Sequence, residues 1–427
     1  MSTKKNHSRQ YDIVVFGATG YTGKYTAEYI AERLPTDLKW AIAGRSQTKL
    51  EEVLAHCKTT NPDRGTSYPS IEVCDLNDSD LSALAKKTFI LIACVGPFCK
   101  LGEYAFKACA ENGTHYLDVT GETPWVLRMI NTYSSAAQKS GALLFPQFGI
   151  ESAPPDLLTY SLASHLRTEH QAKTEDVIIS IHTFNCGPSG GTLATVFSIA
   201  DYVPLPDFVA AYKPYALSPK PNPARVPPPS LWTKLTGLIT APELGLLTTS
   251  VAHKTDAALV HRSWGLLEGT DRAYGPKFSF REFMKTRNYL TGFGMHLGIV
   301  LLQIAIVTPF IRRFLAGWVR QPGTGPDEET ARRDEIEYRG VAKGDVEDGK
   351  EKPEVVGKAW FRGRGAYYCD DDIVTGMLVA EGADTLLRDD AASKLEGGVY
   401  TPAVLGQPLL DRLEKGGLHF ETKTLEK

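Results

Sequence analysis

The sequence lacks the cysteine patterns that bind a metal or build a disulfide scaffold. Its seven cysteines include no Cys-x-x-Cys pair and no zinc-type spacing. We therefore expect no metal site, and we interpret the cysteines as small apolar side chains in a reduced compartment. The first ten residues, MSTKKNHSRQ, are polar and contain no apolar signal region, so we expect a cytoplasmic protein.

The chain also lacks a strong charge of either sign. Its net charge is −3 over 427 residues, which gives no indication of a nucleic-acid partner. The apolar fraction of 42% and this length predict a large core and one to three domains. No clear Ser-Tyr-x-x-x-Lys arrangement of the short-chain dehydrogenases is present.

The stretch YDIVVFGATGYTGK, residues 11–24, is the most informative part of the chain. Its apolar run at 13–16 is typical of a buried parallel strand. Gly17, Gly20 and Gly23 follow at three-residue spacing, and apolar residues then recur at helical intervals up to Leu34. Strand, glycine turn and helix in this order predict a dinucleotide-binding fold. The alternative is a glycine-rich turn that binds no ligand.

The glycine turn also gives candidate cofactor-binding residues. Gly17 permits a tight turn, Gly20 allows the backbone to approach a pyrophosphate, and Gly23 allows the helix to pack on the strand. The helix N-terminus supplies N–H groups and partial positive charge to the phosphates. We add Thr19 and Tyr21, within the same turn, to the predicted phosphate site.

A second predicted strand, Lys39–Ala43, ends at Gly44-Arg45-Ser46. This position, about 20 residues past the glycine turn, is where such a fold binds the ribose of the cofactor. An NAD-preferring site would place an acid here, whereas the guanidinium of Arg45, with Ser46 beside it, suits the 2′-phosphate of NADP. We predict NADP. The alternative for Arg45 is a solvated side chain at a strand end.

Four further strands are predicted at 71–74, 88–95, 115–120 and 142–148, with helices between them. Alternation from residue 11 to about 150 predicts an α/β fold with an N-terminal Rossmann-type, doubly wound parallel sheet. Gly96 and Pro97 follow the fourth strand, where ligands collect in such sheets. We predict that they border the nicotinamide, with Gly149 nearby; an ordinary turn is the alternative.

Several motifs along the chain carry a family resemblance. They are VVFGATGYTG, AGR, VGPF, YLDVTGE, GIESAPPD, SGGT at 189–192, PGTGP at 322–326 and GGVYTPA at 397–403. Together they resemble the saccharopine dehydrogenase-like oxidoreductases, in the branch that includes bacterial trans-acting enoyl reductases. The resemblance implies an NADP-type Rossmann domain and a second α+β domain. The family's usual GFDSIPSD is GIESAPPD here, with acids at Glu151 and Asp156, and its DPGY is replaced by CDDD at 369–372.

We predict three regions: 1–156 as the NAD(P)-binding domain, 157–400 as an α+β substrate domain, and 401–427 as a tail that packs back on the first domain. Within the second region, residues 203–232 are proline-rich and are expected to form an extended loop. A hairpin is expected over 257–275.

Two stretches of the second region carry candidate chemistry. The glycine turn SGGT before a helix predicts a second anion or carboxylate site, with Gly191 and Thr192 as substrate-binding residues; a helix cap is the alternative. Tyr274 lies near a turn and is a candidate proton donor to a developing enolate. A packed aromatic is the alternative for Tyr274.

Residues 289–311 contain no Asp, Glu, Lys or Arg. Their length is sufficient to cross a bilayer. Three interpretations compete: a buried helix of the second domain, a membrane-embedded helix or hairpin, and an exposed apolar surface that docks on lipid. We favour peripheral contact over a true span, and the family resemblance, which includes membrane- and lipid-droplet-associated proteins, supports a lipid contact.

Together these features predict an NADPH-dependent oxidoreductase. By resemblance, the substrate is a small molecule or acyl chain with a polarised C=C bond, of the polyketide or lipid type used in secondary metabolism. The candidate catalytic acids are Asp156, Tyr274 and Glu151, and water is an alternative proton source. Two other functions stay open: a cofactor-binding, membrane-associated scaffold without turnover, and a saccharopine-type imine reductase. An oligomer is compatible with the sequence.

Overall fold

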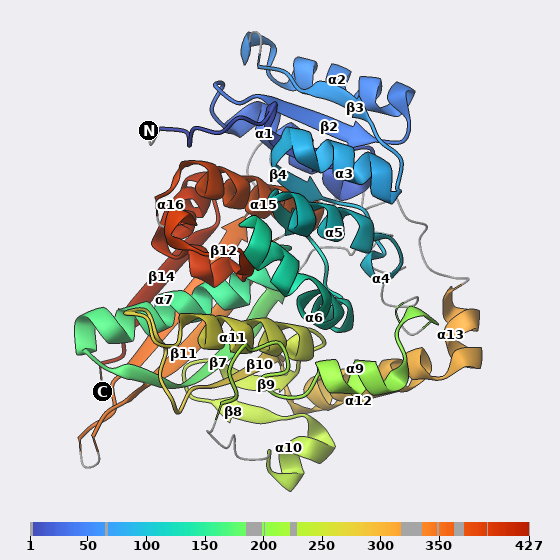
Figure 1. The fold of residues 1–427 in the computed structure, drawn as a ribbon. Coiled ribbons are helices and arrows are strands. Elements are labelled where there is room, and N and C mark those ends of the chain that lie inside the picture. Colours follow the sequence, from blue (N-terminus) through green and yellow to red (C-terminus); the bar gives the residue numbers. More distant parts are fainter. Residues whose placement is uncertain are drawn as a thin grey trace.

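The computed structural model describes residues 3–64, 67–184, 199, 201–222, 229–316, 335–347, 350–362, 371–390 and 392–426. Within these residues the chain forms two sheets of seven strands each. Figure 1 shows the first sheet with its helices at one end of the molecule and the second sheet, crossed by α7 and α11, at the other. Gly191 and Thr192, predicted to bind substrate, lie outside the described residues.

The first sheet is parallel throughout the described residues, in the order β13-β6-β5-β4-β1-β2-β3. Its strands are β1 (Tyr11–Phe16), β2 (Trp40–Gly44), β3 (Ser70–Val73), β4 (Thr88–Ala93), β5 (His115–Asp118), β6 (Leu143–Phe145) and β13 (Gly398–Val399). The six strands predicted before residue 150 are confirmed, and so is the doubly wound α/β fold class. The seventh strand comes from the far end of the chain.

Helices cover both faces of this sheet because its strands are apolar on both sides. In β1, Ile13 and Val15 belong to one buried cluster, whereas Val14 and Phe16 belong to another. The helices of this part are α1 (Tyr21–Arg33), α2 (Gln47–Thr60), α3 (Asp78–Lys87), α4 (Phe98–Leu101), α5 (Glu103–Asn112) and α6 (Thr123–Ser140). The predicted helix end at Gly113 is confirmed, since this residue adopts φ +68° at the C-cap of α5.

The second sheet has the order β14-β12-β11-β7-β10-β9-β8, and only its β7–β10 pair is parallel among the described strands. The strands are β7 (Lys173–Phe184), β8 (Ile239–Ala241), β9 (Gly245–Thr249), β10 (Ser279–Lys285), β11 (Glu335–Asp345), β12 (Glu354–Arg362) and β14 (His419–Thr424). Helix α7 (Ala153–His170) packs on β7, β11 and β12.

The prediction of a hairpin over 257–275 is wrong. Residues His253–Leu267 form the helix α11, which packs on β10 and α7. Ala257, Val260 and Trp264 recur at three- and four-residue intervals and are all buried, so the helical period decides the structure.

The proline-rich stretch is not extended throughout its described part. Helix α9 (Leu205–Ala211) begins directly after Pro204, and α10 (Leu231–Thr236) is capped by Ser230. Proline is tolerated at a helix start because its missing N–H would have no partner there. Helices α13 (Pro309–Ala316) and α16 (Gln407–Gly416) and the short turn η3 (Pro402–Leu405) complete the elements needed below.

The C-terminal part of the chain contributes to both sheets. Helix α15 (Asp371–Arg388) packs on α1, β4 and β5, and β13 pairs with β6. By contrast, β14 pairs with β12 of the second sheet. The expected tail at 401–427 therefore contacts more than the first domain, and the three-region division stays a proposal.

Helix α12 (Tyr289–Val307) lies on the surface, which rules out the buried-helix interpretation of 289–311. Only Gly292 and Ala305 are buried in this helix, and Leu290 and Leu301 are 82% and 56% exposed. Among the described residues it is the one helix that is long and apolar enough to cross a membrane. Figure 1 places it with α9, α10 and α13 at the end of the molecule away from α2.

Candidate functional site

The turn between β1 and α1 has room only for glycine at two of its three glycine positions. Gly17 adopts φ +86°, and a Cβ there would lie 2.6 Å from Cγ2 of Val95. A Cβ on Gly23 would lie 2.2 Å from the carbonyl oxygen of Gly17, so any side chain would push α1 away from the turn. These are the roles that the spacing predicts for the first and third glycines.

Gly20 is the N-cap of α1, and no side-chain hydrogen bond caps the helix there. Its N–H donates to the Gly17 carbonyl at 2.9 Å, which closes the turn. Thr19 is exposed and Tyr21 is half-buried beside it. The N-terminus of α1 therefore opens at the carboxyl edge of the sheet, where backbone N–H groups and the helix dipole can hold a diphosphate.

Arg45 lies at the end of β2, next to this turn. Strands β1 and β2 are paired through Phe16 and Ala43, and the turn amide of Gly17 donates to the Ala43 carbonyl. Arg45 is exposed and forms no ion pair with any described residue, while Ser46 caps α2 by accepting the Lys49 amide. An unpaired guanidinium beside a phosphate turn fits the 2′-phosphate of NADP.

The loop after β4 is fixed by a residue that the sequence analysis did not single out. Glu122, 1% exposed, accepts the backbone amides of Phe98 at 2.6 Å and Cys99 at 2.7 Å. These amides are at the start of α4, so the carboxylate caps that helix and holds the Gly96–Pro97 segment, whose peptide bond is cis. The signal was present in the YLDVTGE motif, where an acid follows a strand.

The loops after β5 and β6 are joined by Asp118. Its Oδ1 accepts the amides of Thr120 at 2.9 Å and Gln147 at 3.0 Å. Burial raises the pKa of this carboxyl to about 7, although the two amides oppose the shift. The carboxyl ends of β4, β5 and β6 are thus held together next to the glycine turn, where a nicotinamide lies in this fold.

Glu151 lies on the loop after β6 and faces the loop after β5. Its Oε2 is 3.2 Å from the position that a Cβ on Gly121 would take. The side chain reaches solvent, yet the protein surrounding it removes enough water to raise its pKa. Of the three candidate acids, Glu151 is the one at the carboxyl edge of the first sheet.

Asp156 and Tyr274 lie in the interior instead. Asp156 is fully buried; its Oδ1 accepts the Ser263 hydroxyl and its Oδ2 accepts the Ala403 amide, so it joins α7, α11 and η3. Tyr274 is 1% exposed and packs on the ring of Phe278 at 5.1 Å between centroids. Its position supports the alternative of a packed aromatic.

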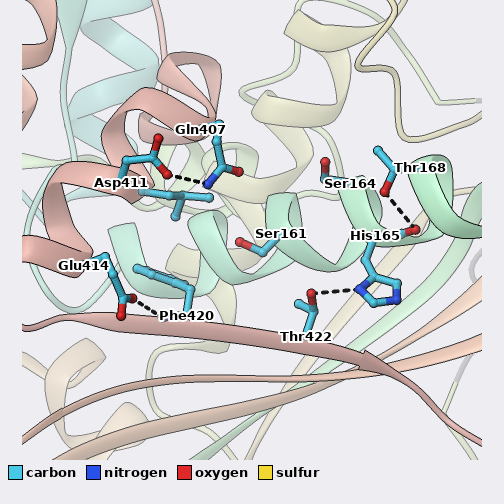
Figure 2. A pocket seen from close by; sticks show the side chains of 10 residues that line it. Ser161, Ser164, His165, Thr168, Gln407, Asp411, Glu414, Phe420 and Thr422 are labelled. Carbon is cyan, nitrogen blue, oxygen red and sulfur yellow. Dashed lines mark hydrogen bonds between the residues drawn. The ribbon is translucent and has the colours of Figure 1, made fainter.

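A separate hollow of about 320 Å³ lies against the C-terminal half of α7. Figure 2 shows its lining from α7, α16 and β14, with His165 bonded to Thr422 and Gln407 bonded to Asp411. None of the predicted site residues lines it. We therefore do not assign this hollow to the cofactor.

Comparison with known proteins agrees with this geometry. Residues 13–145 match the model of the saccharopine dehydrogenase NADP binding domain. A protein of Mycobacterium tuberculosis provisionally named a trans-acting enoyl reductase is 30% identical over 98% of this chain and 98% of its own length. The chain belongs to the saccharopine dehydrogenase-like oxidoreductase family.

Other similarities also extend over nearly the whole chain. The trans-acting enoyl reductase of Mycobacterium bovis is 28% identical over 98% of this chain and 99% of its own length. A lipid droplet localized protein of Caenorhabditis elegans is 27% identical over 97% of this chain and 99% of its own length. The fold is that of apo saccharopine dehydrogenase (L-Glu forming) from Saccharomyces cerevisiae. The TM-score is 0.55 and the identity 11%, and the match covers 97% of this chain and 100% of the yeast chain.

This family member is an NAD(P)-dependent oxidoreductase, and its cofactor is NADP. The matched NADP-binding region contains the glycine turn, Arg45 and the loops after β4 and β5. The prediction of NADP is confirmed at the level of the domain. The assignment of individual residues to the cofactor stays a prediction supported by the geometry described above.

Proposed function

We propose that the protein is an NADPH-dependent enoyl reductase that reduces a polarised C=C bond in a polyketide- or lipid-like substrate. The observation that carries the proposal is the similarity to trans-acting enoyl reductases over 98% of the chain. This similarity extends over both sheets. It therefore covers the region that binds the cofactor and the region that would hold the substrate.

The site geometry supports a division of roles. The turn from Gly17 to Gly23 and the N-terminus of α1 hold the diphosphate, and Arg45 binds the 2′-phosphate. Glu122 and Asp118 keep the loops after β4, β5 and β6 in place, so that the nicotinamide and substrate are oriented between them. The cofactor supplies the hydride, and this chain must position the substrate and exclude water.

The electrostatics of the site argue against a saccharopine-type substrate, which carries three carboxylates. Burial, and then the neighbouring carboxyls of Glu282 and Glu151, raise the pKa of Asp256 near the loop after β6. Within the described residues no basic side chain forms an ion pair with any of the three. Without paired basic side chains this region offers no counter-charge to a tricarboxylate, whereas a neutral acyl chain needs none.

The test is NADPH oxidation by the purified full-length protein with a medium-chain trans-2-enoyl thioester. We expect loss of NADPH absorbance and formation of the saturated thioester, and no reaction with the saturated thioester itself. Oxidation with an imine of 2-oxoglutarate and lysine, but not with the enoyl thioester, would contradict the proposal and favour the imine reductase.

We further propose that the protein contacts a lipid surface through α12 rather than crossing a bilayer. Exposed apolar side chains of α12 and of its neighbour α10 support this: Leu290, Phe293, Leu297, Leu301, Ile304, Leu231, Trp232 and Leu235. Tryptophan is favoured at lipid–water interfaces, and an apolar helix on a soluble fold is suited to lie in the surface plane. A relative named for lipid droplets supports the same location.

A further inference from the structure

The loop after β6 is held by a helix from the far end of the chain. The hydroxyl of Thr375, on α15, accepts the backbone amide of Ile150 at 3.1 Å, and the Thr375 side chain is 6% exposed. Ile150 is itself 1% exposed, so little water can reach its amide. A buried amide needs a partner within the protein, and Thr375 provides it.

The carbonyl of the same residue is held from the second sheet. The hydroxyl of Tyr338, on β11 and 2% exposed, donates to the Ile150 carbonyl at 3.3 Å. The two side chains that bond to Ile150 lie 188 and 225 positions further along the chain. The position of this residue is therefore fixed by α15 and β11 as well as by the loop itself.

Gly149 shows how closely the loop is packed between its neighbours. A Cβ on Gly149 would lie 3.5 Å from the carbonyl oxygen of Val119, in the loop after β5, and 3.7 Å from Oγ1 of Thr375. Beside it, Phe148 donates its amide to the Asp118 carbonyl at 2.8 Å. The loop after β6 thus lies between the end of β5 and α15, at the edge of the sheet where the nicotinamide is expected.

The same stretch of α15 contacts the helix that begins at the diphosphate turn. A Cβ on Gly376, the residue after Thr375, would lie 3.0 Å from the backbone nitrogen of Thr26 in α1. The absence of a side chain at Gly376 lets the two helices approach this closely. Two successive residues of α15 therefore contact both ends of the expected cofactor site: Gly376 contacts the phosphate helix, and Thr375 contacts the loop after β6.

We propose that Thr375 and Tyr338 are positioning residues for the nicotinamide: by bonding to both backbone groups of Ile150, they hold the loop after β6 in the place that orients the nicotinamide ring. The effect on nucleotide binding needs only the NADP cofactor, whereas the effect on turnover rests on the proposed function. Both residues lie outside 13–145, the region that matches the NADP-binding domain. The nicotinamide end of the site is then completed by β11 and α15, while the phosphate end is formed by the first sheet and α1.

Two ligands distinguish the ends of the site. NADP⁺ contains the nicotinamide, and 2′-phospho-ADP-ribose has the same diphosphate and 2′-phosphate without it. Thr375→Val keeps the shape of the side chain and leaves the Ile150 amide without its acceptor. In calorimetry with the full-length protein we expect NADP⁺ affinity to fall roughly tenfold and the affinity for 2′-phospho-ADP-ribose to stay unchanged. Unchanged NADP⁺ affinity, or an equal fall for both ligands, would overturn the inference.

Two variants of α15 show whether the hydroxyl of Thr375 is responsible. Thr375→Ser keeps the hydroxyl, so its NADP⁺ affinity should be close to that of the wild type. Thr385→Val is the matched control, because the Thr385 hydroxyl is also buried but donates to the Glu381 carbonyl within α15. This control should bind NADP⁺ like the wild type. A fall in Thr385→Val as large as in Thr375→Val would show a general effect on the helix and exclude the proposed role.

Tyr338→Phe tests the same loop from the second sheet, and it decides the question if Thr375→Val does not fold. The substitution removes the hydroxyl that donates to the Ile150 carbonyl and keeps the ring. We expect the same selective loss, with weaker binding of NADP⁺ and unchanged binding of 2′-phospho-ADP-ribose. Wild-type affinity for NADP⁺ in this variant would also overturn the inference.

Kinetics with the medium-chain trans-2-enoyl thioester provide the second readout. Thr375→Val and Tyr338→Phe should lower kcat at saturating NADPH, because the nicotinamide is misaligned for hydride transfer, and should leave the KM of the thioester unchanged. A raised KM with unchanged kcat would contradict a role in orienting the nicotinamide. If the wild type shows no NADPH oxidation, the proposed function fails, while the comparison of the two ligands still decides whether Thr375 and Tyr338 hold the nicotinamide end.

Discussion

The carboxylate of Glu122 accepts the backbone amide of Phe98 at 2.6 Å across the gap between the loops after β5 and β4. A second bond, to the Cys99 amide, makes the contact bidentate and orients the first turn of α4. The Gly96–Pro97 segment is held between this contact and β4, so the shape of the expected nicotinamide site depends on a residue that need not touch the cofactor.

Replacing Glu122 with Gln should therefore weaken both the fold and cofactor binding. The amide group of Gln turns a donor toward one backbone N–H and leaves that N–H unpaired in a buried place, at a cost of about 1–3 kcal/mol. We expect urea unfolding to show this loss and calorimetry to show weaker NADPH binding. Tighter NADPH binding by the variant would contradict the assigned role.

Gly23→Ala tests the close packing of α1 on the glycine turn. The added Cβ would be 2.2 Å from the Gly17 carbonyl oxygen, so the helix must move and NADPH affinity should fall at least tenfold. Gly294→Ala is the matched control, since a Cβ there meets nothing within 4 Å on the exposed α12. This control should gain up to about 1 kcal/mol in helix stability. Equal NADPH affinity in both variants would refute the assignment.

Arg45→Asp tests the choice between cofactors. Loss of a charge-assisted contact worth about 1.5–3 kcal/mol, with an added repulsion, should weaken NADPH binding by roughly tenfold or more. NADH lacks the 2′-phosphate, so its affinity should change little. Fluorescence titration of both nucleotides distinguishes the outcomes, and the same loss for NADH and NADPH would show that Arg45 does not bind the phosphate.

The burial of Asp156 should make the free energy of unfolding depend on pH. Burial raises its pKa to about 7 in the folded protein, so the folded state holds this proton more tightly than the unfolded chain. Stability should rise as pH falls from about 7 toward the ordinary carboxyl value near 4, by at most about 1.4 kcal/mol per pH unit for one group. In Asp156→Asn, urea unfolding across this window should give a flatter profile than in the wild type.

Lysine substitutions at Leu301 and Leu302 test the lipid surface. Both side chains are exposed, so the variant should fold and retain NADPH binding while losing flotation with phospholipid-coated triacylglycerol droplets. Val73→Lys, a similarly exposed apolar position on the edge strand β3, is the matched control and should float like the wild type. Flotation of the Leu301/Leu302 variant at the wild-type level would exclude α12 as the contact.

The first sheet could be predicted in detail because each of its early strands is a short apolar run between local turn signals. Gly17 and Gly113 are examples in which one residue type fixes a positive φ. The membership of β13 could not be predicted, since two residues, Gly398 and Val399, pair with β6 across a large sequence separation. Long-range pairing of so short a strand leaves no periodic pattern.

The candidate site was only partly predictable for a related reason. The glycines act through the backbone conformations that they permit, and Arg45 acts through its position directly after a strand. Both features can be recognised in the sequence. Glu122 and Asp118 matter because of the backbone amides that they accept from other loops, and the sequence does not show these contacts. The expected hairpin over 257–275 is wrong because the helical period of buried side chains in α11 outweighs the turn residues that follow it.

The placement of β13 and β14 has a consequence for how the protein forms during synthesis. Both strands are edge strands, one in each sheet, and α15, which covers α1, also comes from this last part of the chain. Neither sheet can acquire its final edge until residues 398–424 have left the ribosome. The NADP-binding half, although translated first, therefore spends nearly the whole of translation with an uncovered apolar flank that chaperones can recognise.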